Sequence, residues 1–218
     1  MYALVIAVLS VVFALVSLQV AVEGPLLAAD PVLRDTVGRW TTPHGPLSVA
    51  GEVAADLGGA LVAGGVLAVG AGLAAWRDRS WTPLLLAVLA AVSVPAVVLP
   101  LKGAFSRLGP DGLPLAGYAG YYPSGHTMTA VVAYGMTALL FARTLPVAAP
   151  AVAALLSLST GVGLVLRGYH WASDVVASWA LGGIVLCLLA PLTTRVLPRP
   201  AGAQRPATDT ATGTRSAS

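Results

Sequence analysis

The sequence predicts an all-α, polytopic membrane protein in which six transmembrane helices form one bundle. Of its 218 residues, 57% are hydrophobic and only 10% carry a charge, a composition typical of proteins with several membrane spans. Apolar runs of about 16 to 25 residues recur along the chain, and as helices they are long enough to cross most or all of a hydrocarbon core about 30 Å thick. This composition excludes a soluble globular domain.

The six predicted spans cover residues 2–22, 51–75, 83–100, 127–142, 146–166 and 172–192. No Lys or Arg precedes the first run and no cleavage site of small residues follows it, so a spanning helix is favoured over a signal peptide. The segment 23–49 contains four prolines and predicts a surface loop with short amphipathic pieces. Glu52 and Asp56 lie one turn apart near the entry of the second run, where pairing with a loop is favoured over a catalytic role.

Residues 1–197 are expected to form a single transmembrane domain, followed by a disordered cytoplasmic tail over residues 198–218, which have no apolar period. An even number of spans places both termini on one side of the membrane. Seven arginines fall on that side, namely Arg77, Arg79, Arg143, Arg195, Arg199, Arg205 and Arg215, against Arg34, Arg39, Lys102, Arg107 and Arg167 on the other. The positive-inside rule therefore places the termini in the cytoplasm. The abundance of Ala, Val, Leu and Gly favours a bacterium, so the predicted location is a bacterial plasma membrane.

The stretch Tyr-Tyr-Pro-Ser-Gly-His at 121–126 precedes the fourth apolar run and predicts a helix start with Ser124 as its N-cap. Unpaired N–H groups then gather at Ser124, Gly125 and His126, and the helix dipole favours negative charge at the same place. Such a helix start is suited to bind an anion, and phosphate is the obvious candidate. A capped membrane helix with an interfacial histidine is the simpler alternative.

Three segments are expected at the same extracytoplasmic face, namely 102–110, 123–126 and 167–174. His170 and Asp174 are four residues apart, so on a helix they share a face, and the carboxylate can orient the imidazole. Alone, this spacing is more often a polar pair at a helix end. A second histidine and three cations, Lys102, Arg107 and Arg167, converge on the same face, and together they favour a catalytic site.

These residues resemble the pattern of the type 2 phosphatidic acid phosphatase superfamily, which includes bacterial membrane lipid phosphatases and, more distantly, the vanadium haloperoxidases. The resemblance extends from residue 102 to about residue 183. It is carried by Pro123-Ser124-Gly125-His126, by His170-Trp171 with Asp174, and by Lys102 with Pro110 at the spacing of the first motif of the family.

Two positions depart from the family pattern, and both concern an arginine. The family has an Arg where this chain has Gly109, although Arg107 stands two positions earlier. The family also has a Ser-Arg pair where this chain has Gly163 and Leu164, with Arg167 one helical turn later. Because one Lys and two Arg are retained in total, we interpret the pattern as a shifted phosphate clamp. A relative that binds the lipid phosphate without turnover is the alternative.

The resemblance implies that His170, oriented by Asp174, attacks phosphorus and forms a phosphohistidine. His126 then protonates the departing oxygen and later activates water. The groups implied to bind the phosphate oxygens are Lys102, Arg107, Arg167, the Ser124 hydroxyl and the Gly125 N–H. Neither a metal ion nor another cofactor is expected.

The predicted function is therefore that of an integral membrane phosphatase acting on a lipid phosphomonoester or diphosphate at the outer face of the membrane. An isoprenyl diphosphate carrier used in wall assembly is the first choice of substrate, and phosphatidate or phosphatidylglycerophosphate are alternatives. A non-catalytic protein that binds or translocates a lipid phosphate is the rival from another class. The expected partners are the phosphorylated lipid and membrane lipids, with no nucleic acid.

Overall fold

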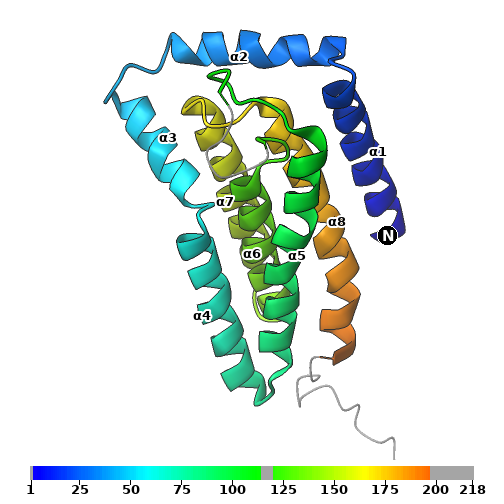
Figure 1. Cartoon of the computed structure of the whole chain (residues 1–218). Coiled ribbons are helices and arrows are strands. Elements are labelled where there is room, and N and C mark those ends of the chain that lie inside the picture. Colours follow the sequence, from blue (N-terminus) through cyan, green and yellow to red (C-terminus); the bar gives the residue numbers. More distant parts are fainter. Residues whose placement is uncertain (1, 114–119, 197–218) are drawn as a thin grey trace, which may run out of the picture.

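The computed structural model describes residues 2–113 and 120–196, and within these ranges every regular element is a helix (Figure 1). The elements are α1 (Tyr2–Ala21), the 3-10 helix η1 (Pro25–Ala28), α2 (Ala29–Gly38), α3 (Pro46–Asp56), α4 (Ala60–Asp78), α5 (Thr82–Phe105), α6 (Gly125–Phe141), α7 (Ala148–Leu166) and α8 (Ala172–Val196). The all-α prediction is confirmed. The tail predicted over 198–218 lies outside the described residues.

Five of the described helices, α1, α4, α5, α7 and α8, are long and apolar enough to cross a membrane. The helix α6 is also apolar but has only 17 residues. The prediction of a polytopic membrane protein is confirmed, whereas the count of six spans is not exactly confirmed, because the described residues contain five helices of spanning length and one shorter apolar helix.

The second predicted span is not continuous, because a turn between α3 and α4 interrupts it at residues 57–59. The Tyr134 hydroxyl donates a hydrogen bond to the Leu57 carbonyl oxygen over 2.6 Å, which fastens this turn to α6. Gly58 packs so closely that a Cβ there would lie 2.7 Å from the carbonyl oxygen of His126. The prediction of one helix over 51–75 was wrong because two consecutive glycines and these contacts favour a break.

The helix α6 occupies the centre of the bundle and contacts α4, α5, α7 and α8. Most of its side chains are buried, including those of Met128, Met136 and Leu140. Within a membrane this contact between helices is stabilised mainly by van der Waals packing, since lipid is as apolar as the side chains. The neighbouring helices therefore separate the polar start of α6 from lipid.

The start of α6 lies deeper in the bundle than the C-terminal end of its neighbour α5. A Cβ on Gly125 would lie 4.0 Å from Val98 Cγ1, which places the two residues at the same level. Val98 precedes the last residue of α5, Phe105, by seven positions, or about 10 Å at about 1.5 Å per residue. The residues at the start of α6 are thus recessed from that end of the bundle.

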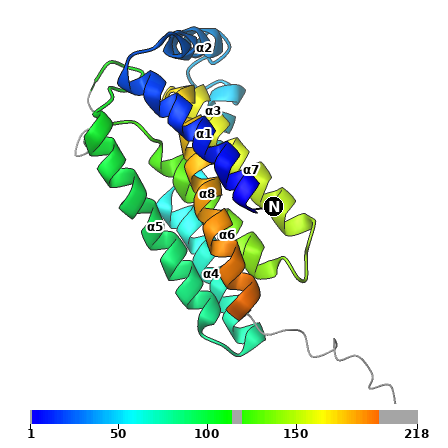
Figure 2. The ribbon, with the colours of Figure 1, turned by 90° about the vertical axis from the view of Figure 1, so that its right-hand side faces the viewer.

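The short helix α2 lies across the same end of the bundle in both views (Figures 1 and 2). Asp30 is its one buried residue, whereas Val32 is 65% exposed and Leu33 is 41% exposed. On the outside of the bundle, α1 packs along α8 (Figure 2). The N-terminal segment is thereby brought to the end of the molecule where the predicted site residues lie.

Candidate active site

The turn before α6 is built as the sequence predicts, with Ser124 as the N-cap. The Ser124 Oγ accepts hydrogen bonds from the Thr127 backbone N–H at 3.3 Å and from the Thr127 hydroxyl at 3.0 Å. The Ser124 side chain is fully buried. Its hydroxyl oxygen therefore helps to satisfy the N–H groups that every helix start leaves unpaired.

Hydrogen bonds fix this turn against the start of α8. The Ser124 N–H donates to the Asp174 carbonyl oxygen at 3.3 Å, and the Ser178 hydroxyl lies 2.9 Å from the carbonyl oxygens of both residues. Beside Gly125, in contrast, there is space, since Val98 Cγ1 is the nearest atom that an added Cβ would meet. The first turn of α6 is thus held rigidly and can still be approached at Gly125.

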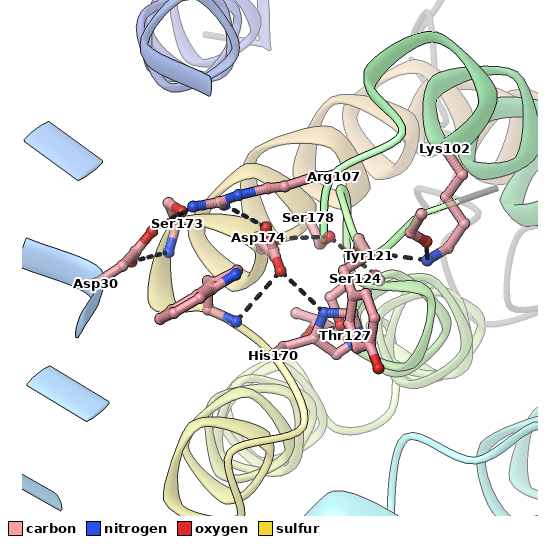
Figure 3. A network of polar contacts seen from close by, with 12 residues as sticks. Asp30, Lys102, Arg107, Tyr121, Ser124, Thr127, His170, Ser173, Asp174 and Ser178 are labelled. Atoms are coloured by element: carbon pink, nitrogen blue, oxygen red, sulfur yellow. Dashed lines mark hydrogen bonds and ion pairs between the residues drawn. The ribbon is translucent and has the colours of Figure 1, made fainter. Parts of the chain in front are cut away.

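The structure brings His170 and Asp174 together across one turn at the start of α8 (Figure 3). The His170 Nδ1 lies 3.1 Å from Asp174 Oδ2, which also accepts a hydrogen bond from the Trp171 backbone N–H at 3.2 Å. Asp174 is fully buried and His170 is 8% exposed. With Nδ1 engaged by the carboxylate, Nε2 remains as the ring nitrogen that can react.

Arg107 lies between two carboxylates, a position that the sequence did not predict (Figure 3). Its NH1 donates to Asp174 Oδ1 and to the Ser173 hydroxyl, each at 2.6 Å, and its NH2 donates to Asp30 Oδ2 at 2.8 Å. Its guanidinium also lies over the Trp171 ring, 5.6 Å from the centroid. The side chain predicted to bind phosphate is therefore bonded to Asp174 and to α2.

Asp30 and Ser173 are the members of this network that the sequence analysis missed. Asp30 Oδ1 accepts a hydrogen bond from the Ser173 backbone N–H at 3.1 Å, and its Oδ2 accepts one from the Ser173 hydroxyl. One indication of a role for Asp30 was present in the sequence, where it is the single acid in the otherwise apolar segment 25–33. Because the contact joins residues 143 positions apart, no local periodicity reveals it.

Lys102 is buried at the end of α5 and reaches the loop that precedes α6. Its Nζ donates to the carbonyl oxygen of Gly120 at 2.6 Å and to that of Tyr121 at 3.3 Å (Figure 3). Lys102 and His170 are both near enough to His126 to act electrostatically on its imidazole, as is Asp56 at the end of α3. The His126 side chain is exposed. The two histidines and Lys102 are therefore neighbours, as the sequence predicts.

Arg167 is directed toward α3. Its Nε donates to Glu52 Oε2 at 2.5 Å, and its guanidinium also bonds to the Ser48 hydroxyl and, at 3.5 Å, to the Tyr169 hydroxyl. The Tyr169 hydroxyl and the Arg167 guanidinium together lower the pKa of the Glu52 carboxyl. These contacts do not bring Arg167 to the His170 imidazole, and its predicted role in a phosphate clamp stays a prediction.

Close packing accompanies the two departures from the family pattern. A Cβ at Gly109 would lie 2.4 Å from the ring of Tyr121, and a Cβ at Gly163 would lie 2.6 Å from backbone atoms of α3. The neighbouring Leu164 is only 2% exposed. In this chain an aromatic ring and α3 fill the space that larger residues would need at these positions.

Two hollows open beneath α2. One of about 950 Å³ reaches the network at Arg107 and Trp171 and extends along α2 and the end of α1. The other, of about 820 Å³, lies between the second half of α2 and residues 165–169. Arg34 and Asp111 line both hollows, which places the two side by side.

Comparison with known proteins gives a match to the PAP2 superfamily over residues 80–198. The matched segment includes Lys102, His126, His170 and Asp174, and it excludes Asp30 with all of α1 to α4.

Two characterised relatives are similar to part of the chain. Lipid A 1-phosphatase of Porphyromonas gingivalis is 34% identical over 113 residues, which are 50% of this chain and 24% of that protein. Phosphatidylglycerophosphatase B of Bacillus subtilis is 26% identical over 131 residues, which are 57% of this chain and 64% of that protein. The chain thus matches less than two thirds of the length of either relative.

The fold is also that of a solved structure, the transmembrane PAP2-type phosphatidylglycerolphosphate phosphatase from Bacillus subtilis. The two superpose with a TM-score of 0.77 at 20% sequence identity, over 90% of this chain and 98% of the other. At this identity the likeness establishes a shared fold, including the helices outside the segment matched by the family.

Proposed function

Because the chain belongs to the PAP2 superfamily, we propose that it is a membrane phosphatase that hydrolyses the phosphate of a lipid. The observation that carries the proposal is the buried His170–Asp174 pair, which is hydrogen-bonded at the start of α8 and has His126 nearby at the start of α6. A histidine with an ordered carboxylate and a second histidine provide a nucleophile and a general acid in one site.

In the first step His170 Nε2 attacks phosphorus while Asp174 holds the Nδ1–H. A P–N bond forms, the bond from phosphorus to the lipid oxygen breaks, and His126 donates its proton to that departing oxygen. In the second step His126 takes a proton from water, the water oxygen attacks phosphorus, and the P–N bond breaks. Inorganic phosphate leaves and both histidines return to their starting states.

The phosphate is proposed to lie against the first turn of α6. There is space beside the Gly125 Cα, the Ser124 cap fixes the turn, and the charge of Lys102 acts on the same region. Arg107 and Arg167 belong to the predicted clamp, but each is bonded to a carboxylate. Each guanidinium can reach a phosphate either with the N–H groups that these bonds leave over or by exchanging one of these partners.

The names of the relatives favour a lipid phosphomonoester as substrate, since one relative is a lipid A 1-phosphatase and the other a phosphatidylglycerophosphatase. We therefore place phosphatidylglycerophosphate and phosphatidate ahead of the isoprenyl diphosphate that the sequence analysis preferred, since neither name supports a diphosphate. Seven arginines belong to the side of the membrane opposite the site, against five Lys and Arg residues on the side of the site. By the positive-inside rule, this excess supports a site on the extracytoplasmic side of a bacterial plasma membrane.

Release of inorganic phosphate by the purified full-length protein tests the proposal. The panel comprises phosphatidate, phosphatidylglycerophosphate, a lipid A 1-phosphate and an isoprenyl diphosphate, each assayed with EDTA and with His170→Ala as control. We expect release from at least one phosphomonoester, unchanged by EDTA and lost in the variant. Binding of these lipids without release would favour the non-catalytic alternative, and loss of activity in EDTA would contradict metal independence.

A further inference from the structure

We propose that Asp30 of α2 is a positioning residue for the reaction, acting through Arg107 and Asp174 on His170. The inference rests on the proposed function, in which His170 is the nucleophile. It adds to that function a residue that lies 50 positions before the segment matched by the family.

The contacts of Asp30 set it apart from the rest of α2. Both of its carboxylate oxygens accept hydrogen bonds, Oδ1 from the Ser173 backbone and Oδ2 from Arg107 and the Ser173 hydroxyl. The side chain is 5% exposed, whereas the rest of α2 is half-buried or exposed. A buried carboxylate is costly unless it is paired, so these bonds hold this end of α2 in a defined position.

Asp30 also determines where the Arg107 guanidinium lies. The planar guanidinium is held by Asp30 at NH2, by Asp174 at NH1 and by the face of Trp171. Without Asp30, NH2 would lose its carboxylate partner, and the guanidinium would be held by charge only at NH1. With Asp30 present, the plane of the guanidinium is fixed on two sides.

A fixed Arg107 in turn orients Asp174. One oxygen of Asp174, Oδ1, faces Arg107, and the other, Oδ2, faces the His170 Nδ1 (Figure 3). Rotation of this carboxylate is thereby prevented, and the imidazole keeps Nε2 in one direction. A shift of about 1 Å at a reacting atom can cost about 100-fold in rate, so this orientation matters for catalysis.

Charge leads to the same conclusion. Arg107 next to Asp174 alone would neutralise the carboxylate on which His170 depends. With Asp30 present, Arg107 contacts two carboxylates, and all three side chains are nearly buried. The net charge of the three is −1, so a negative charge remains next to the His170 imidazole. Asp30 thus compensates Arg107 and leaves Asp174 able to stabilise the imidazolium character that develops on His170 as it attacks.

The test compares Asp30→Asn with Asp35→Asn, an exposed acid on the same helix, in the full-length protein. Wild type and His170→Ala are assayed first, so that a failure of the proposed function is recognised separately as an absence of His170-dependent turnover. For Asp30→Asn we expect kcat to fall about 10- to 100-fold with little change in KM, and for Asp35→Asn we expect near wild-type values. A kcat within about twofold of wild type in Asp30→Asn would overturn the inference.

A double variant distinguishes positioning from a general structural role. If Asp30 acts through Asp174, adding Asp30→Asn to Asp174→Asn will lower kcat no further, whereas independent effects would multiply. Multiplied losses would contradict the proposal. If Asp30→Asn does not fold, Ser173→Ala takes its place. This variant removes the hydroxyl that donates a hydrogen bond to Asp30 and keeps the charges of Asp30 and Arg107. The same non-additivity with Asp174→Asn is then expected.

Discussion

Two arginines near the same end of the bundle each pair with a carboxylate from the N-terminal half, but in different surroundings. The Arg107 side chain is 13% exposed and its partners Asp30 and Asp174 are 5% and 0% exposed. For Arg167 and Glu52 the values are 31% and 41%. Water and salt screen the exposed pair, whereas the buried pair keeps its strength and is costly to break.

The two pairs also lead to different groups. Arg107 bonds to Asp174, which in turn bonds to the His170 ring. Arg167 bonds to the Tyr169 hydroxyl and to residues of α3. The sequence analysis assigned both arginines to the phosphate because it counted cations on one face. Two arginines with one predicted role thus differ in burial and in the groups they contact, so their substitutions are expected to differ in effect.

The largest effect is expected at the two histidines, of which His170 is connected to Arg107 through Asp174. His170→Ala will abolish both turnover and the trapped phosphoenzyme, because it removes the nucleophile. His126→Ala will retain labelling with an aryl phosphate, whose leaving group needs no proton. Labelling from a radioactive aryl phosphate, quenched in alkaline detergent because phosphohistidine is stable to base and labile to acid, measures both, and a label that requires His126 and survives His170→Ala would reverse the two roles.

Arg107→Gln is expected to have the next largest effect. It leaves the buried Asp30 and Asp174 carboxylates without their cation, so we expect a lower unfolding temperature and a loss of about 100-fold or more in kcat/KM. Arg107→Lys keeps the charge without the two-pronged geometry and will fall between this variant and wild type. A Lys variant with wild-type kinetics would mean that charge alone matters here.

Local spacing predicted the parts of the site that lie within one helical turn. The Ser124 cap and the His170–Asp174 pair follow from residues three or four positions apart, whose geometry a helix fixes. The contact of Arg107 with Asp30 spans 77 positions and depends on how α2 folds over the bundle. Pairings of that kind leave no periodic trace in the sequence.

The helices likewise follow from local sequence, whereas the break in the second predicted span involves a long-range contact. Helices form in all six apolar runs, as apolar length predicts, although the second run is divided between α3 and α4. At the break before α4 the Leu57 carbonyl oxygen accepts a hydrogen bond from the Tyr134 hydroxyl, 77 positions away, a contact that the local sequence does not reveal. Gly58 and Gly59 were a usable signal, but so many glycines occur in this run that they did not stand out.

A smaller effect is expected when the family pattern is restored beside Arg167. Gly163→Ser places a side chain against backbone atoms of α3 that would lie 2.6 Å from its Cβ, so the helices must separate. We expect a destabilisation of about 1 to 3 kcal/mol, typical of overpacking, measured as thermal unfolding in detergent. Gly65→Ser is the matched control, because its Cβ meets no atom within 4 Å. Equal stability of the two variants would show that α3 yields readily at Gly163.

The smallest effect is expected at Arg167. Its guanidinium bonds to Ser48, Glu52 and Tyr169 at a partly exposed surface, so Arg167→Ala will lower kcat/KM no more than a few-fold. The pKa of Glu52 is lowered by these partners, so whatever the pair adds to stability is present above the ordinary pKa of a Glu and is lost as the pH falls through the lowered value.

The control for Arg167→Ala is Glu52→Gln, which removes the carboxylate of the same pair and leaves the guanidinium in place. If Arg167 only fastens α3, the two variants will have the same small effect on kcat/KM and on stability. If Arg167 exchanges Glu52 for the phosphate during the reaction, Glu52→Gln will release the guanidinium and keep or raise activity, whereas Arg167→Ala will lose about 100-fold. That pattern, measured as phosphate release from the preferred lipid, would restore Arg167 to the phosphate clamp and leave Arg107 as the arginine that serves Asp174 alone.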